Sequence, residues 1–130
     1  MVICDKHRKR ANEIASMVVI GDVTDKDIVL IDDICDTAGT LTKSAALLME
    51  KGARSVRAFC THPVFSGKAY ENIENSVLEE LVVCDTIPLK QQSSKVKVIS
   101  VADLFAVAIR NMHENKSITS LYVHSNRRMQ

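Results

Sequence analysis

Residues 28–40 read IVLIDDICDTAGT and join a continuous apolar run to a short polar loop. The run at 28–31 shows no alternation of apolar and polar side chains. Such a run is typical of a parallel strand that is covered on both faces, so we expect it inside an α/β sheet. The small and hydroxyl residues that follow lead into a helical pattern, and this order predicts a strand–loop–helix unit.

Strands and helices are expected to alternate along the rest of the chain. Short apolar runs predict further strands at 17–20, 55–60, 81–84 and 96–99, and a short strand within 117–124. The helical spacing of apolar residues predicts helices at 41–51, 66–75 and 100–112. Alternating elements with short connections imply an α/β fold in which a mainly parallel sheet is flanked by helices.

Three features of the sequence predict where helices begin or end. Gly52 stands where a helix C-terminal glycine belongs, after the pattern at 41–51. Ser66 is a candidate cap for the start of the next helix. Ser100 is followed three residues later by Asp103, and this spacing resembles a capping box.

The chain has 130 residues, a hydrophobic fraction of 46% and a formal net charge of +1. These values are typical of one globular domain, which we place at residues 1–124, with a tail at 125–130. A near-neutral total gives no general attraction to nucleic acid or to an anionic membrane surface. The N-terminal segment carries its positive charges after its apolar residues, which is the wrong order for a secretory signal. We therefore expect a cytoplasmic protein without nucleic-acid or membrane partners.

Cysteine and histidine usage argues against a metal site built by this chain. The cysteines at 4, 35, 60 and 84 lack the close spacing of zinc ligands, and no pair of histidines has metal-ligand spacing. Cys60 and Cys84 lie in apolar runs and are expected to be buried free thiols. His62 precedes Pro63 at the end of a predicted strand, so we expect a turn or packing role for it rather than catalysis.

The loop after the apolar run has the composition of a phosphate cradle. Small residues at Ala38 and Gly39 allow backbone N–H groups to approach an anion closely, and Thr37 and Thr40 add hydroxyl donors. The helix that follows contributes free N–H groups and the positive end of its dipole. This combination predicts an anion site, and phosphate is the anion that such loops commonly hold.

Three acidic residues lie in the same stretch. Asp32 and Asp33 are suited to accept hydrogen bonds from a diol or from a hydrated Mg²⁺ ion. Neighbouring side chains on a regular strand point to opposite faces, so the chain must bend here if both are to reach one ligand. Asp36 has two open interpretations: it orients the loop by accepting backbone hydrogen bonds, or it acts as a base for a sugar hydroxyl.

The stretch at 28–40 resembles the phosphoribosyl-diphosphate fingerprint of the type I phosphoribosyltransferase fold. Other strings resemble the C-terminal half of the ribose-phosphate pyrophosphokinase family, among them DKHRKRANE at 5–13, GARSVRAFCTHPVFSG at 52–67 and NSVLEELVVCDTIPL at 75–89. The resemblance covers nearly the whole chain except the tail. It implies transfer of the diphosphoryl group of ATP to O1 of ribose 5-phosphate, which yields phosphoribosyl diphosphate and AMP.

The resemblance also implies a role for nine residues. Asp32 and Asp33 would face the ribose hydroxyls, and Lys6 and Arg8 would act in catalysis from a mobile loop. Five residues would hold the 5-phosphate: Asp36, Thr37, Ala38, Gly39 and Thr40. The family loop often has glycine at the position of Ala38. Alanine costs little unless its φ is positive, so we expect it to be tolerated there.

The resemblance further implies Mg²⁺ as cofactor, ribose 5-phosphate and ATP as substrates, and a homo-oligomer in the full-length enzyme. Most Mg²⁺ ligands would lie in the N-terminal half of the family enzyme, which this chain lacks, or on the substrates. We therefore expect a fragment that is inactive alone. Three alternatives stay open: a non-catalytic regulatory homologue, a nucleotide-forming phosphoribosyltransferase domain that binds a ribose phosphate, and an oligomerisation module.

Overall fold

The computed structural model of the protein describes residues 3–7 and 16–123. Contacts divide the chain into two compact units, Met1–Val98 and Ile99–Gln130, and each is described by itself. The first unit holds six strands and two helices: β1 (Ile3–His7), β2 (Ser16–Ile20), β3 (Asp27–Cys35), α1 (Gly39–Glu50), β4 (Ser55–Pro63), α2 (Ala69–Glu74), β5 (Leu81–Cys84) and β6 (Val96–Ile99). The second unit holds two helices: α3 (Ala102–His113) and α4 (Ser120–Val123). No helix in the described part of the chain could cross a bilayer.

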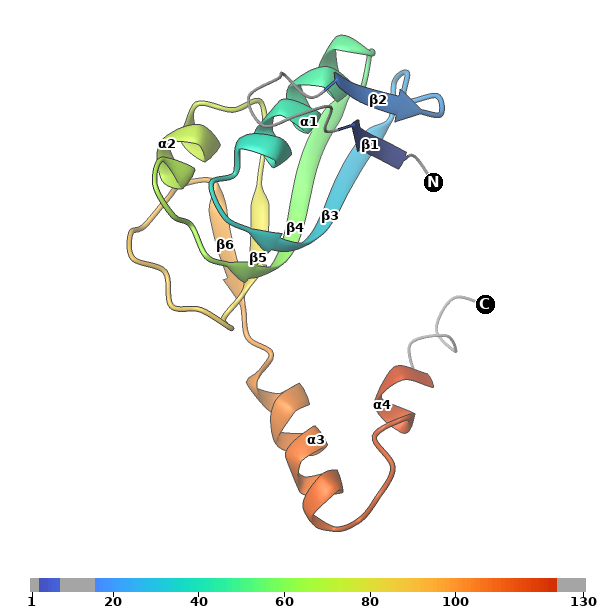
Figure 1. Ribbon diagram of the computed structural model, residues 1–130, viewed down its shortest axis with the longest axis vertical. Helices are drawn as coiled ribbons and strands as arrows, with labels where there is room; N and C mark the ends of the chain where they lie inside the picture. The colour runs from blue at the N-terminus through green and yellow to red at the C-terminus, as the bar shows by residue number, and fades with distance from the viewer. Residues whose placement is uncertain (1–2, 8–15, 124–130) are drawn as a thin grey trace. The chain divides into compact units, whose positions relative to one another are not determined.

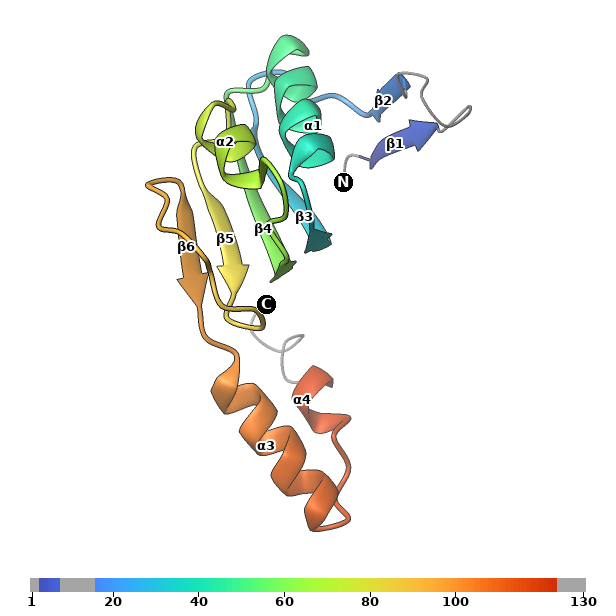
Figure 2. The same ribbon diagram turned by 60° about the vertical axis from the view of Figure 1, so that its left-hand side comes forward.

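The main sheet of the first unit has four strands in the order β3-β4-β5-β6. The pairs β3–β4 and β4–β5 are parallel, and the arrows of all four strands point the same way in Figure 2. This arrangement confirms the mainly parallel sheet that the sequence predicts. Strands β1 and β2 form a separate antiparallel pair in which Lys6 lies opposite Met17.

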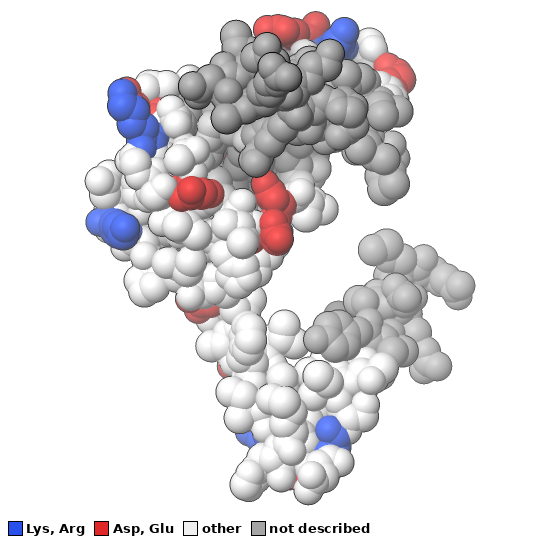
Figure 3. Space-filling view, in the orientation of Figure 1, with Lys and Arg blue, Asp and Glu red and all other residues white. Residues whose placement is uncertain are grey.

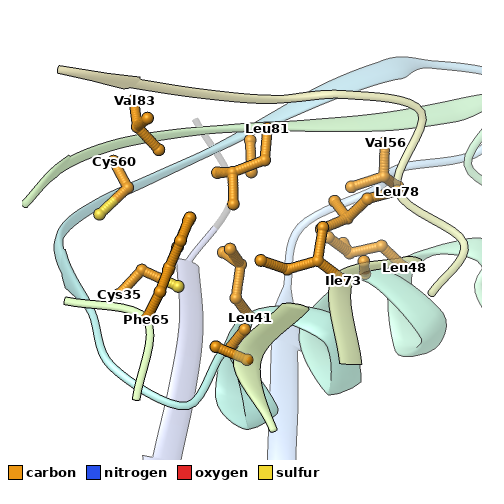
Figure 4. Packing of buried hydrophobic residues seen from close by; sticks show 14 of the residues in the cluster. Cys35, Leu41, Leu48, Val56, Cys60, Phe65, Ile73, Leu78, Leu81 and Val83 are labelled. Carbon is orange, nitrogen blue, oxygen red and sulfur yellow. The ribbon is translucent and has the colours of Figure 1, made fainter. Parts of the chain in front are cut away.

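Helices α1 and α2 lie on one face of the sheet (Figure 1). The buried core residues come from these two helices, from the strands and from the loops that join them. Leu41 and Leu48 of α1 and Ile73 of α2 point toward side chains of the sheet, such as Leu81 and Val56 (Figure 4). Full burial of such aliphatic side chains contributes about 1.5–3 kcal/mol each to folding. This layer therefore holds β3 and α1 in place on either side of the loop between them.

The other face of the sheet is open among the described residues of the first unit. Val29 is 60% exposed and Ile31 is 81% exposed, whereas Ile28 and Leu30 pack against the core. The prediction that the run at 28–31 is covered on both faces is therefore wrong for this chain. Both helices that follow β3 in the unit lie on the same side, so only the even-numbered residues of the run are covered.

Helix α1 ends as Gly52 predicts. Gly52 has a φ of +91°, its N–H donates to the carbonyl of Met49, and the N–H of Ala53 donates to the carbonyl of Leu48. This pair of bonds is a Schellman motif, in which glycine accepts the left-handed conformation without a steric penalty.

At the same end of the sheet the Arg54 guanidinium pairs with the Asp27 carboxylate. This ion pair joins the starts of β3 and β4 and holds the Asp27 pKa well below its usual range.

Two other helix starts differ from the sequence predictions. Ser66 does not cap α2, which begins at Ala69; its hydroxyl donates to the Asp36 carboxylate instead. Ser100 accepts a hydrogen bond from the N–H of Ala102, but the N-cap position of α3 is Val101, so no capping box forms with Asp103.

The described residues of the second unit that follow β6 contain the two helices α3 and α4. α3 has no buried residue, and the apolar side chains of Leu104, Phe105 and Ile109 are each more than half exposed. Leu104 and Phe105, with Ala108 and Leu121, line a small apolar cavity of about 160 Å³. The short strand predicted within 117–124 is wrong: the described residues 117–123 contain no strand, and Ser120–Val123 form the single helical turn α4.

Candidate functional site

The candidate site lies at the carboxyl end of β3, where a three-residue loop leads into α1. In open parallel sheets this is the end at which ligands bind. A cavity of about 420 Å³ opens there, lined by Asp32, Ile34, Cys35, Asp36, Thr37, Ala38, Gly39, Thr40 and Leu41. The cavity is large enough for a sugar phosphate, and its wall is made of one continuous segment of chain.

The cavity brings together most of the residues predicted to bind a ribose phosphate. Six of them line it: Asp32, Asp36, Thr37, Ala38, Gly39 and Thr40. Asp33 is not among the lining residues. Lys6 lies within strand β1 rather than in a loop, and Arg8 lies outside the described residues.

Asp32 and Asp33 lie on a strand that continues through both of them. The pairing of β3 with β4 keeps one register on both sides of the two acids, with Asp32 opposite Cys60 and Ile34 opposite His62, so no bulge turns the two carboxylates to one face. Each carboxylate accepts a hydrogen bond from the next backbone N–H, at 3.0 Å for Asp32 and 2.9 Å for Asp33. Burial raises the pKa of Asp32, and the neighbouring carboxylate of Asp33 adds to this. The strand therefore presents one carboxylate, that of Asp32, to the cavity.

The start of α1 is open to an anion. Its N-cap residue, Ala38, makes no side-chain capping bond, and the first turn holds no acidic residue. The N–H groups of a first helical turn have no partner within the helix, and the positive end of the dipole favours negative charge. Thr37 contributes a hydroxyl close to this turn, because a Cβ built on Gly39 would lie 3.6 Å from Thr37 Oγ1.

Ala38 has a left-handed backbone conformation, with φ 60° and ψ 2°. The sequence-based expectation that alanine is tolerated here without cost is therefore wrong, since it held only for a negative φ. An L-residue in this region costs about 1–2 kcal/mol. Because the side chain is also 4% exposed, the methyl group is fixed against the core and cannot move away.

Segment 66–72 braces the loop from outside. The hydroxyl of Ser66 donates to the Asp36 carboxylate, and its N–H donates to the Asp36 carbonyl at 3.0 Å. The side-chain amide of Asn72, on α2, donates to the Thr37 carbonyl at 2.9 Å. These contacts favour the loop-orienting interpretation of Asp36. Sequence reasoning missed Ser66 and Asn72 as supports, since they lie 30 and 35 residues from their partners.

His62 is the second-last residue of β4, lies opposite Ile34 of β3 and is held by the segment after β5. The Thr86 hydroxyl lies 2.9 Å from both the Thr61 carbonyl and His62 Nδ1. The single hydroxyl hydrogen goes to the carbonyl, so Nδ1 carries the ring hydrogen and donates to Thr86. His62 thus ties β4 to the segment after β5, as its predicted structural role requires.

The cysteines near the cavity are poor nucleophiles. Cys35, Cys60 and Cys84 are all buried free thiols, which confirms the prediction for Cys60 and Cys84. Burial raises the pKa of Cys35 to about 12, although the N–H of Ala38 opposes the shift. Burial also raises the pKa of Cys60. At neutral pH both groups are therefore held as thiols, which are weaker nucleophiles than thiolates.

Charges outside the cavity form no single-sign patch on the face that Figure 3 shows, where acidic and basic side chains are scattered. No group of three or more His, Cys, Asp or Glu side chains within residues 3–7 and 16–123 could hold a metal ion. Asp32 supplies a carboxylate of the kind that Mg²⁺ accepts alongside water and substrate phosphates. The described donors thus fit a Mg²⁺ ion that arrives with its substrate.

Comparisons with known proteins show to which family the chain belongs. A family model of the phosphoribosyl synthetase-associated domain matches residues 5–123. The chain belongs to this family. Ribose-phosphate pyrophosphokinases of Campylobacter jejuni and Wolinella succinogenes are each 57% identical to it over 123 residues, which are 95% of the chain and 40% of either relative. This phosphoribosyl synthetase-associated domain thus spans about 40% of the length of the curated relatives that it matches.

A solved structure supports the fold of the phosphoribosyl synthetase-associated domain. The phosphoribosylpyrophosphate synthetase of Mycobacterium smegmatis superposes with a TM-score of 0.76 at 34% sequence identity. The match covers 86% of this chain and 37% of that one. The expectation of a type I phosphoribosyltransferase-like fold is confirmed.

Proposed function

We propose that this chain forms the ribose-phosphate site of a ribose-phosphate pyrophosphokinase. The observation that carries the proposal is the cavity at the end of β3, in which a helix start without an acidic residue adjoins a carboxylate. The first feature suits a phosphate, and the second suits a sugar hydroxyl. The relatives that share 57% of the aligned residues are named for an enzyme that uses such a substrate.

In the proposed complex the 5-phosphate lies against the start of α1. Backbone N–H groups and the hydroxyls of Thr37 and Thr40 donate hydrogen bonds to it. Asp36 orients the loop through Ser66, while Asp32, the one of the two neighbouring acids that lines the cavity, accepts hydrogen bonds from the ribose. Positioning of the sugar in this way leaves its 1-hydroxyl outside the phosphate cradle.

The proposed reaction transfers the β,γ-diphosphoryl group of ATP. O1 of ribose 5-phosphate attacks the β-phosphorus, the bond from that phosphorus to the α,β-bridging oxygen breaks, and AMP leaves while the hydroxyl proton is lost. Lys6 and Arg8 stabilise the negative charge that spreads over the phosphoryl oxygens, as cations do in such transfers. Bound Mg²⁺ would neutralise phosphate charge. In the proposal, ATP and Mg²⁺ contacts come mainly from other parts of the longer enzyme, which acts as a homo-oligomer in the cytoplasm.

Calorimetric titration of ribose 5-phosphate into the chain tests the site. Thr40→Val removes one hydroxyl donor and keeps the size of the side chain. Loss of a hydrogen bond to a charged group should lower the affinity by about tenfold or more. Thr24→Val is the matched control, because Thr24 precedes β3 at the other end of the strand. Equal affinities of the parent and Thr40→Val for ribose 5-phosphate would contradict the proposed cradle.

A further inference from the structure

The two peptide units on either side of Ala38 are both held by hydrogen bonds. The carbonyl before it, that of Thr37, accepts from Asn72 Nδ2 at 2.9 Å. The carbonyl of Ala38 itself accepts from the N–H of Thr42 at 3.0 Å and from its hydroxyl at 2.9 Å. The φ and ψ angles of one residue set the angle between its two flanking peptide planes. Both planes are clamped, so Ala38 is kept in its left-handed conformation.

The two clamps have different origins. Thr42 belongs to the first turns of α1 and forms its bonds whenever that helix forms. Asn72 belongs to α2 and reaches the loop across the tertiary structure. The N–H of the Thr37–Ala38 peptide bonds to Cys35, while its carbonyl is held by Asn72. Without Asn72 that carbonyl loses this bond, and Ala38 lowers its free energy by leaving the left-handed region. A strained residue persists only where its surroundings over-determine it.

The angle at Ala38 decides how the cavity wall is built. On one side of it lie Asp36 and Thr37, and on the other side lies the start of α1. The left-handed joint folds Thr37 back over the helix, which places its hydroxyl near Gly39. A right-handed or extended Ala38 would carry Thr37 away from the helix start and separate the two halves of the cradle.

We propose that Asn72 is a positioning residue for the phosphate cradle: its side-chain amide holds the left-handed joint at Ala38 and so keeps Thr37 against the start of α1. Asn72 acts through the Thr37 carbonyl and makes no contact with the ligand. The ligand part of this inference rests on the proposed function, whereas the conformational part rests only on the hydrogen bonds.

The test is a double-mutant cycle between Asn72→Ala and Ala38→Gly, with Asn75→Ala as control. Asn75 is the same residue type at the end of the same helix, and no side-chain hydrogen bond of Asn75 is found in the described part of the chain. Alanine is a better helix former than asparagine, so Asn72→Ala does not weaken α2 through its propensity. Both asparagine variants are made with alanine and with glycine at position 38.

Affinity for ribose 5-phosphate is the first measurement. Asn72→Ala should weaken binding by about 5- to 30-fold when position 38 is alanine, which is the penalty of the left-handed region expressed as a ratio. With glycine at position 38 the same change should weaken binding less than about threefold, since glycine enters that region freely. Asn75→Ala should leave the affinity unchanged. Equal losses in both backgrounds would overturn the inference, because a general structural role for Asn72 is not rescued by glycine.

The second measurement needs no ligand. The ¹³C chemical shifts of the Ala38 Cα and Cβ report its φ and ψ, and they should leave left-handed values in Asn72→Ala but not in Asn75→Ala. Shifts that stay left-handed in Asn72→Ala would refute the positioning role whatever the affinities. If the shifts move as expected but neither the parent nor any variant binds ribose 5-phosphate, the clamp stands and the proposed function fails.

Discussion

Replacement of Ala38 by glycine has an effect that can be worked out from the structure. Relief of the left-handed conformation should stabilise the fold by about 1–2 kcal/mol. The loss of one buried methyl group costs about 0.8 kcal/mol, and the extra freedom of glycine in the unfolded chain costs about 0.4–1 kcal/mol. These contributions nearly cancel, so the free energy of unfolding should change by less than about 1 kcal/mol.

Ala45→Gly is the matched comparison for this change. Ala45 is also buried, at 0% exposure, and lies inside the same helix with right-handed angles. Glycine costs about 0.8–1 kcal/mol in a helix interior, and the methyl group adds about 0.8 kcal/mol. Ala45→Gly should therefore destabilise the protein by about 2 kcal/mol, with no strain relief to offset the loss.

Urea unfolding followed by circular dichroism measures both variants. At a typical slope of the unfolding free energy against urea concentration, the urea midpoints of the two variants should differ by about 1 M, and the midpoint of Ala38→Gly should lie near that of the parent protein. If glycine destabilises the chain equally at positions 38 and 45, Ala38 is not strained and the left-handed joint does not exist in solution. The inference about Asn72 would then lose its basis as well.

Two further outcomes are expected. The pKa of Cys35 rises from 9.0 to about 12 on folding; between these pH values the unfolded chain loses a proton that the folded chain keeps, so the free energy of unfolding falls as the pH rises. Urea unfolding from about pH 8 to about pH 11 should show this decline, and Cys35→Ala should lessen it, whereas identical declines would contradict the assigned cause. This chain alone should also release no AMP from ATP and ribose 5-phosphate in a coupled assay, because the proposed ATP contacts lie mainly elsewhere; clear turnover would contradict that division of roles.

The parts of the fold set by local pattern were predictable from the sequence. The strands at 81–84 and 96–99 have the predicted bounds, and α1 begins two residues before the prediction. Apolar runs and helical spacing are local signals that burial then enforces. Gly52 was predictable for the same reason, since few other residues accept its φ of +91°.

The wrong or missed predictions all concern segments whose structure depends on tertiary contacts. β1 was missed because Ile3–His7 becomes a strand only by pairing with Ser16–Ile20. The segment 117–124 has β-branched and aromatic residues, yet a strand needs a partner, and a single helical turn bonds its own backbone instead. The run at 28–31 could not reveal that both neighbouring helices lie on one side.

The candidate site shows the same division. The residue types of the loop at 36–40 predicted an anion cradle, and the structure gathers them around one cavity. The sign of φ at Ala38 could not be predicted, because alanine gives no signal for a left-handed conformation. The supports from Ser66 and Asn72 were hidden as well, since hydrogen bonds between distant residues leave no periodic mark on the sequence.

The bare side of the β3–β6 sheet has a practical consequence for anyone who handles this chain. Val29 and Ile31 lie on β3, which is one of the two edge strands of that sheet. Exposed apolar side chains on an edge strand favour self-association of protein molecules. Salting-out agents should precipitate the parent chain sooner than Ile31→Lys. The solubility of this chain during purification should therefore depend on these exposed apolar side chains more than on the buried core.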